Sequence, residues 1–243
     1  MECGIDLASE KRKAPVRSRR SRKWLRNIVL GALLLVVAFY GICIVAVIGL
    51  RWIDPPTTAV QIERRVSAVF KHQRYHKRYD FVPMHGISIN LQHAVVAAED
   101  TRFRIHHGFD WVEMQKVLEQ DLARHKLGRG GSTITQQLVK NLFLSTQRSL
   151  VRKGIEFTLV PIVEKLLTKD RILELYLNVI EWGPGVYGAQ AAAEFYYHVP
   201  AADVNLDQAA RLAAIIPAPL KRKPAQMNEY SAEILDRMSK MGW

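Results

Sequence analysis

The first candidate catalytic residue in this sequence is a glutamate that precedes a basic and aromatic segment. Glu99 and Asp100 close a predicted helix, just before Arg102, His106 and His107. The negative end of the helix dipole favours a protonated carboxyl group, and partial burial would also raise its pKa. Glu99 therefore fits a general base for a hydroxyl nucleophile, although most single glutamates at helix ends are simply exposed. The adjacent histidines have no matching third ligand, which disfavours zinc.

Polar residues recur along a second predicted helix, which follows Gly130-Gly131-Ser132. Thr133 and Gln136 form a capping box, which predicts a helix running to about Phe143. Amides, hydroxyls and an ammonium group suit sugar hydroxyls and phosphate oxygens. A solvated helix face is the alternative, since it has the same pattern. The predicted substrate-binding residues here are Ser132, Thr133, Gln136, Gln137, Lys140 and Asn141.

Two arginines and a glutamate follow at intervals of four residues, as Arg148, Arg152 and Glu156. This spacing places them on one helix face. The guanidinium groups could grip pyrophosphate, while the carboxylate orients them or holds a metal ion. Glu156 and Asp100 are the metal-ligand candidates. The alternative is a surface Arg–Glu pair, worth roughly 0.3–0.5 kcal/mol.

A charge-free segment, IVLGALLLVVAFYGICIVAVIGL, occupies residues 28–50. Roughly 20 apolar residues are enough to cross a bilayer, so it predicts a transmembrane helix. A cleaved signal peptide is the alternative, but its apolar region would be shorter and end at a small-x-small site. Residues 1–27 carry nine Lys or Arg and three Asp or Glu. We therefore expect a cytoplasmic tail, with everything after the helix outside the membrane.

The net charge of +12 suggests an anionic partner, and nucleic acid is one class. Half of this excess lies in the short tail beside the predicted span, which favours a membrane and argues against nucleic acid. The two cysteines, Cys3 and Cys43, lie in the tail and the span. The exported part therefore has no disulfide and depends on a packed core.

Helical periodicity dominates the exported part, which predicts an all-α fold. Asn90, Asp170 and Asn205 are predicted helix caps, and Pro161 is expected to kink its helix. Residues 51–86 form a basic and aromatic membrane-proximal segment. That segment is either a solvated helical surface or a surface resting on anionic lipid headgroups.

Taken together, the polar groups resemble four ordered motifs of the peptidoglycan glycosyltransferase family (glycosyltransferase family 51), in its stand-alone, monofunctional form. The resemblance covers about residues 87–220. One departure is Tyr196-Tyr197-His198, where the family commonly has Tyr-Phe-Gly, and it concerns packing. The motifs are Glu99-Asp100-x-x-Phe103-x-x-His106-x-Gly108, Gly131-Ser132-Thr133-Ile134-Thr135-Gln136-Gln137-Leu138-x-Lys140-Asn141, Arg152-Lys153-x-x-Glu156 and Lys169-x-x-Ile172-Leu173-Glu174-x-Tyr176-Leu177-Asn178.

This resemblance implies a lysozyme-like glycosyltransferase domain over residues 87–243, preceded by a membrane-embedded jaw and a single N-terminal transmembrane helix. It implies that Glu99 deprotonates the 4-hydroxyl of lipid II, which attacks a growing glycan linked to polyprenyl pyrophosphate, with inversion. Lys140, Arg148 and Arg152 would stabilise the departing pyrophosphate. Glu156, the second catalytic residue, would organise these bases or a divalent cation (Mg or Mn) that is not obligatory.

The expected partners are lipid II, the lipid-linked glycan chain and the membrane, with cell-division or elongation proteins as candidates and no nucleic acid. The expected location is the cytoplasmic (inner) membrane, with the catalytic domain on the periplasmic or external side. A lysozyme-like hydrolase is one rival, but it has no leaving phosphate for Lys140, Arg148 and Arg152 to bind. A membrane-tethered wall-binding protein is another, and it does not need Glu99 together with a cationic face.

Overall fold

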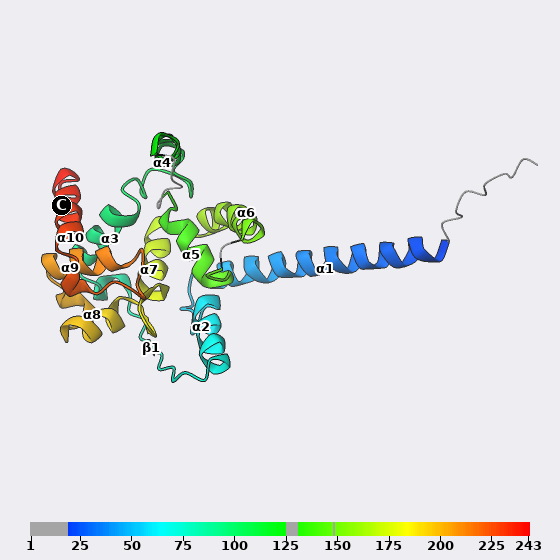
Figure 1. Cartoon of the computed structure of the whole chain (residues 1–243), viewed down its shortest axis with the longest axis horizontal. Helices are drawn as coiled ribbons and strands as arrows, with labels where there is room; N and C mark the ends of the chain where they lie inside the picture. Colours follow the sequence, from blue (N-terminus) through cyan, green and yellow to red (C-terminus); the bar gives the residue numbers. More distant parts are fainter. Residues whose placement is uncertain (1–18, 125–130, 148) are drawn as a thin grey trace, which may run out of the picture. The chain divides into compact units, whose positions relative to one another are not determined.

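The computed structural model describes residues 19–124, 131–147 and 149–243, which are mostly helical (Figure 1). The all-α fold predicted from the sequence is confirmed. The helices are α1 (Arg19–Gly49), α2 (Ala59–Phe70), α3 (Ile89–Glu99), α4 (Trp111–Arg124), α5 (Ile134–Phe143), α6 (Leu150–Leu166), α7 (Lys169–Val179), α8 (Ala189–Tyr197), α9 (Leu206–Ile215) and α10 (Asn228–Lys240). The strands are β1 (Arg78–Tyr79), β2 (Glu181–Gly183) and β3 (Val186–Tyr187), and the 3₁₀ turns are η1 (Met84–Gly86), η2 (Ala201–Asp203) and η3 (Pro224–Gln226).

The first helix carries the apolar segment predicted to cross a membrane. Its stretch Lys23–Gly49 is long and apolar enough to do so. The chain divides into two compact units, Met1–Cys43 and Ile44–Trp243, so most of α1 belongs to a unit of its own. These features fit a membrane-anchored protein. The tail at residues 1–18 lies outside the described residues, and the predicted orientation of the helix stays a prediction.

The core of the helical unit is built around α3, α9 and α10, which pack on one another. Alanines make up much of α9, and Ala209, Ala210, Ala213 and Ala214 are fully buried. Small side chains let helix axes approach closely. A second group forms around α5, which packs against both α6 and α7. The polar motifs predicted from the sequence lie on α5, α6 and the end of α3, so these two helix groups position them.

Two of the four predicted helix caps are present, and the other two helices start at different residues. The capping box at Thr133 is confirmed, and α5 ends at Phe143 as expected. Asn205 also caps its helix as predicted. The predictions for Asn90 and Asp170 were wrong, because α3 starts after Ser88 and α7 starts after Thr168. Thr168 has an extended backbone and its hydroxyl accepts a hydrogen bond from the Arg171 backbone nitrogen, whereas Ser88 makes no side-chain capping bond.

The helix α6 runs continuously from Leu150 to Leu166 and contains Pro161 in its interior. Proline removes one backbone donor, so the predicted kink at this position stays a prediction.

Hydrogen bonds tie the segment after α1 to the rest of the helical unit. Arg64 of α2 donates to Glu181 of β2 at 2.9 and 3.1 Å. Glu63, also on α2, accepts hydrogen bonds at 2.7 and 2.8 Å from the backbone nitrogen and hydroxyl of Thr146, which follows α5. The strand β1 pairs in parallel with β3, and β3 pairs antiparallel with β2. The predicted domain boundary at residue 86 stays a prediction.

Candidate active site

The carboxylate of Glu99 lies on the last residue of α3 and is half-buried. The amide of Gln137, on α5, donates to Glu99 Oε2 at 2.6 Å. The oxygen of the same amide accepts a hydrogen bond from the Tyr176 hydroxyl of α7 at 3.0 Å. Desolvation raises the pKa of Glu99 above its ordinary value, although the Gln137 bond and the charge of Lys140 oppose this. A carboxylate with a fixed orientation and a raised pKa suits general base catalysis.

Most polar atoms at the start of α5 form hydrogen bonds within the protein. Gln136 N donates to Thr133 Oγ1 at 3.2 Å, and Thr133 N donates to Gln136 Oε1 at 2.9 Å. The Thr133 hydroxyl also donates to the carbonyl of Gly108 at 2.7 Å. Asn141 is likewise buried and donates to the Gln137 carbonyl at 2.8 Å. These contacts position the helix, and the substrate-binding roles predicted for Thr133, Gln136 and Asn141 stay predictions.

Lys140 lies on α5 and is half-buried. Its pKa is lowered chiefly by desolvation, while Glu156 and Glu99 raise it and Arg152 lowers it. Lys140 is therefore within electrostatic reach of both the Glu99 carboxylate and the charged groups of α6. In the part of the chain that the structure describes, no hydrogen bond or ion pair engages its ammonium group. A desolvated cation without a partner is suited to bind an anion.

The charged groups of α6 form a compact set around Glu156, which is almost fully buried. Arg152 Nη1 donates to Glu156 Oε2 at 2.8 Å, and Lys153 Nζ donates to Glu156 Oε1 at 2.5 Å. Lys153 also reaches the hydroxyl of the exposed Ser132 at 3.4 Å. Arg152 Nε is buried and has no partner among the described residues. The sequence predicted the Arg152–Glu156 pair, and Arg148 lies outside the described residues.

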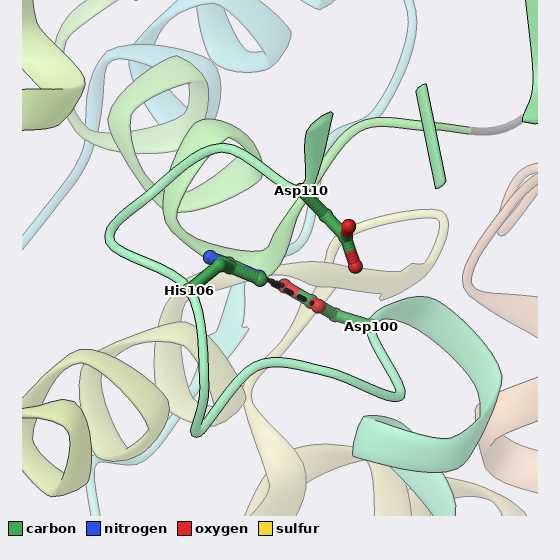
Figure 2. Close-up of side chains that lie close together, drawn as sticks. All are labelled: Asp100, His106 and Asp110. Carbon is green, nitrogen blue, oxygen red and sulfur yellow. Dashed lines mark hydrogen bonds and ion pairs between the residues drawn. The ribbon is translucent and has the colours of Figure 1, made fainter. Parts of the chain in front are cut away.

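A second cluster, drawn in Figure 2, lies at the start of α5, where the Ile134 backbone nitrogen donates to Asp100. Asp100, His106 and Asp110 are buried, and their ligand atoms lie within 4.8 Å of one another. The sequence pattern did not identify Asp110 as a third group. His106 Nε2 contacts both oxygens of Asp100 at 2.8 and 3.0 Å, while the Gly108 N–H donates to His106 Nδ1 at 3.1 Å. Because Nδ1 accepts a hydrogen bond, the neutral ring carries its proton on Nε2 and donates it to Asp100.

The predicted metal ligands do not fit a divalent cation. The neutral His106 ring turns an N–H toward Asp100, which also accepts a hydrogen bond from the Ile134 backbone at 3.0 Å. Asp110 accepts hydrogen bonds from Arg102 at 3.1 Å and from the Glu113 backbone at 3.0 Å. Both oxygens of Glu156 are bonded to cationic side chains. Neither predicted ligand therefore has a carboxylate oxygen without a hydrogen-bond donor.

Comparison with known proteins decides the family. The family model described as transglycosylase matches residues 64–241. The chain belongs to the transglycosylase family.

Relatives of this transglycosylase carry the printed name biosynthetic peptidoglycan transglycosylase. The protein from Thiobacillus denitrificans is 48% identical over 81% of this chain and 85% of the relative. That from Caulobacter vibrioides is 42% identical over 90% of this chain and 91% of the relative. A third, from Bordetella avium, is 40% identical over 90% of this chain and 96% of the relative.

The transglycosylase match includes every described site residue, from Glu99 to Glu156, and the protein is therefore a glycosyltransferase enzyme. Lys153 and Tyr176 also contact this site; both stand in the motifs quoted above, but the sequence assigned no role to them. Lys153 could have been found, because a lysine three residues before a glutamate faces it on a helix. For Tyr176 the motif was the available signal, because no spacing rule predicts its contact with Gln137, which lies 39 positions away.

Proposed function

We propose that this transglycosylase polymerises the glycan strands of peptidoglycan. The donor is a growing glycan linked through pyrophosphate to a polyprenyl lipid, and the acceptor is lipid II. The names of the relatives support peptidoglycan as the product. The apolar helix α1 supports a substrate held in a membrane.

Glu99 is the general base in this proposal. The oxygen of the acceptor 4-hydroxyl bonds to the anomeric carbon of the donor, and its proton passes to Glu99. The bond between that carbon and the phosphate oxygen breaks on the opposite face, so the configuration inverts. The electron pair of the broken bond leaves on polyprenyl pyrophosphate. The raised pKa of Glu99 makes it a stronger proton acceptor than an exposed carboxylate.

The observation that carries the proposal is the ammonium of Lys140, which no hydrogen bond or ion pair engages among the described residues and which lies within electrostatic reach of Glu99 and Glu156. Negative charge develops on the leaving pyrophosphate, and a cation already placed there stabilises it without rearrangement. Arg152, whose Nε has no partner in the described chain, offers a second donor. We assign Arg148 to the same task because it stands four residues before Arg152 in the sequence. Glu156 holds Arg152 and Lys153 in place through its two oxygens.

The remaining predicted residues divide into two groups in this proposal. Ser132 is exposed and Gln137 contacts the Glu99 carboxylate, so these two can touch substrate. Thr133, Gln136 and Asn141 are buried, and their proposed role is to hold the substrate-facing residues in position. This division predicts that changes in the second group reduce stability together with activity.

The proposed location is the cytoplasmic membrane, with α1 as the single anchor and the catalytic unit on the external side. The basic tail at residues 1–27 supports this orientation, because positive charges flanking a span remain in the cytoplasm. Lipid-linked donors present their pyrophosphate at the membrane surface, where an anchored enzyme reaches it.

A direct assay is incubation of the detergent-purified full chain with lipid II, followed by gel separation of the products. Wild type should give glycan polymer, and Glu99→Gln should give about 10²-fold less, since it cannot accept the proton. Glu233→Gln, an exposed change on α10, is the matched control and should polymerise normally. Polymer from Glu99→Gln at the wild-type rate would exclude Glu99 as the base.

A further inference from the structure

A cavity of about 530 Å³ lies between α2 and the segment that leads to β1, and none of the proposed catalytic residues lines it. In Figure 1 this is the region of α2 and the connection that follows it. Ligand-binding cavities commonly have volumes of about 300–1,000 Å³. The lining side chains that bear on its chemistry are Gln61, Ile62, Arg65, Val66, Tyr75 and Lys77.

Two cationic side chains, the exposed Arg65 and the half-buried Lys77, line this cavity. Burial and the nearby charge of Arg65 both lower the pKa of Lys77. Lys77 donates to the Pro56 carbonyl at 3.1 Å, a neutral partner. Among the residues that the structure describes, no carboxylate forms an ion pair with Lys77 or Arg65. An anion bound near both side chains would therefore reduce the electrostatic repulsion between them.

The amide of Gln61 is a second, independent sign of a ligand. This side chain is 2% exposed, and neither its nitrogen nor its oxygen has a hydrogen-bond partner within the described ranges. Buried amides are normally satisfied, because leaving one unpaired costs free energy. A ligand that fits must both accept a hydrogen bond and donate one.

The rim of the cavity is apolar on the side of α2. Ile62 and Val66 line it and are 52% and 47% exposed, and Val69 and Phe70 continue the exposed apolar surface. The helix starts at Ala59, shortly after the membrane helix ends at Gly49. A ligand with an anionic head and an apolar tail would match both parts of this surface.

We propose that this cavity binds the headgroup of an anionic phospholipid of the surrounding bilayer. The phosphate lies between Arg65 and Lys77, hydroxyl groups of the head satisfy the Gln61 amide, and the acyl chains follow Ile62 and Val66. This site is separate from the transfer reaction and does not depend on it.

The test is native mass spectrometry of the full chain in detergent, titrated with dihexanoyl phosphatidylglycerol, dihexanoyl phosphatidylcholine or inorganic phosphate. Wild type should retain phosphatidylglycerol in preference to the other two. Arg65→Ala/Lys77→Ala should weaken its retention about tenfold or more. Lys71→Ala/Arg74→Ala removes the same charge from exposed positions of the same segment and should leave retention unchanged.

Two outcomes would overturn the proposal. Equal loss in both double variants would mean that diffuse positive charge, and not the cavity, attracts the lipid. Equal retention of phosphatidylcholine, or displacement by inorganic phosphate at matching concentration, would mean that the site does not recognise an anionic lipid head. Gln61→Leu adds a check on the amide, because it should weaken phosphatidylglycerol retention without changing net charge. Polymer formation is not measured, so failure of the proposed transfer reaction would leave this result interpretable.

Discussion

Replacing Lys140 with methionine separates the contribution of its charge to catalysis from its contribution to folding. Methionine keeps an unbranched side chain and suits a helix. Desolvation lowers the pKa of Lys140 in the folded chain, so its positive charge costs folding free energy. That cost is fully present at a pH below the lowered folded pKa, and it disappears as the pH rises above the unfolded value. At neutral pH the variant should therefore unfold at the wild-type temperature or above it.

The activity of Lys140→Met should change in the opposite direction. One charged hydrogen bond to a phosphate is worth about 1.5–3 kcal/mol. By the rate relation this corresponds to roughly a 10- to 150-fold loss in transfer. Because the ammonium is half-buried, we expect the upper part of this range. The assay compares initial rates of lipid II polymerisation and thermal unfolding in one detergent.

The control for this change is Lys240→Met, which alters an exposed lysine paired with Asp236 on α10. It should leave the rate unchanged. A rate for Lys140→Met within twofold of wild type would refute the assignment of the ammonium to the leaving group. A fall in unfolding temperature that parallels the loss of rate would instead make Lys140 a structural residue.

Three other predictions follow from the same structure. Because burial raises the pKa of Glu99, kcat/KM should fall with decreasing pH at values above 4.5, and this acid limb should vanish from the residual activity of Glu99→Gln. His198 is exposed and caps α8 at φ 57°, so His198→Gly should raise the free energy of unfolding by about 0.5–1 kcal/mol in thermal unfolding. Reporter fusions at Ser9 and Tyr79 should report opposite sides of the membrane.

Each of these has a clear contradicting result. An acid limb that persists in Glu99→Gln belongs to another group. A less stable His198→Gly would mean that the imidazole makes a contact that outweighs the backbone strain. A cytoplasmic reporter at Tyr79 would contradict the proposed orientation and place the catalytic unit on the wrong side for an external substrate.

Local sequence signals predicted the parts of this fold that depend on a few neighbouring residues. The capping box at Thr133 and Gln136 needs only atoms three positions apart, and both of its bonds are present. The same reasoning failed at Asn90 and Asp170, because several residues in each stretch can serve as caps. Which one is used depends on where the helix packs. Asp170 forms an ion pair with Arg104 instead of capping its helix.

Contacts between distant residues were beyond the reach of the sequence. The hydrogen bond from Gln137 to Glu99 was not predicted, although both residues were assigned to the site. Arg64 and Glu181 are 117 positions apart, so no spacing rule connects them. At the departure from the family pattern, the structure places His198 at a left-handed helix end, and the interpretation as a packing difference stays a prediction. The sequence alone did not show this left-handed conformation of His198, which follows from its backbone angles.

In the proposed reaction, the chain forms a glycosidic bond while the bond between the donor sugar and its lipid-linked pyrophosphate breaks. The most direct measurement counts polyprenyl pyrophosphate released against glycosidic bonds formed when the full chain acts on lipid II. We expect one polyprenyl pyrophosphate to be released for each glycosidic bond formed. In Arg152→Ala the two products should decrease in parallel. Digestion of lipid-free peptidoglycan by wild type and by Arg152→Ala alike, with no polymer from lipid II, would contradict the account and favour a hydrolase.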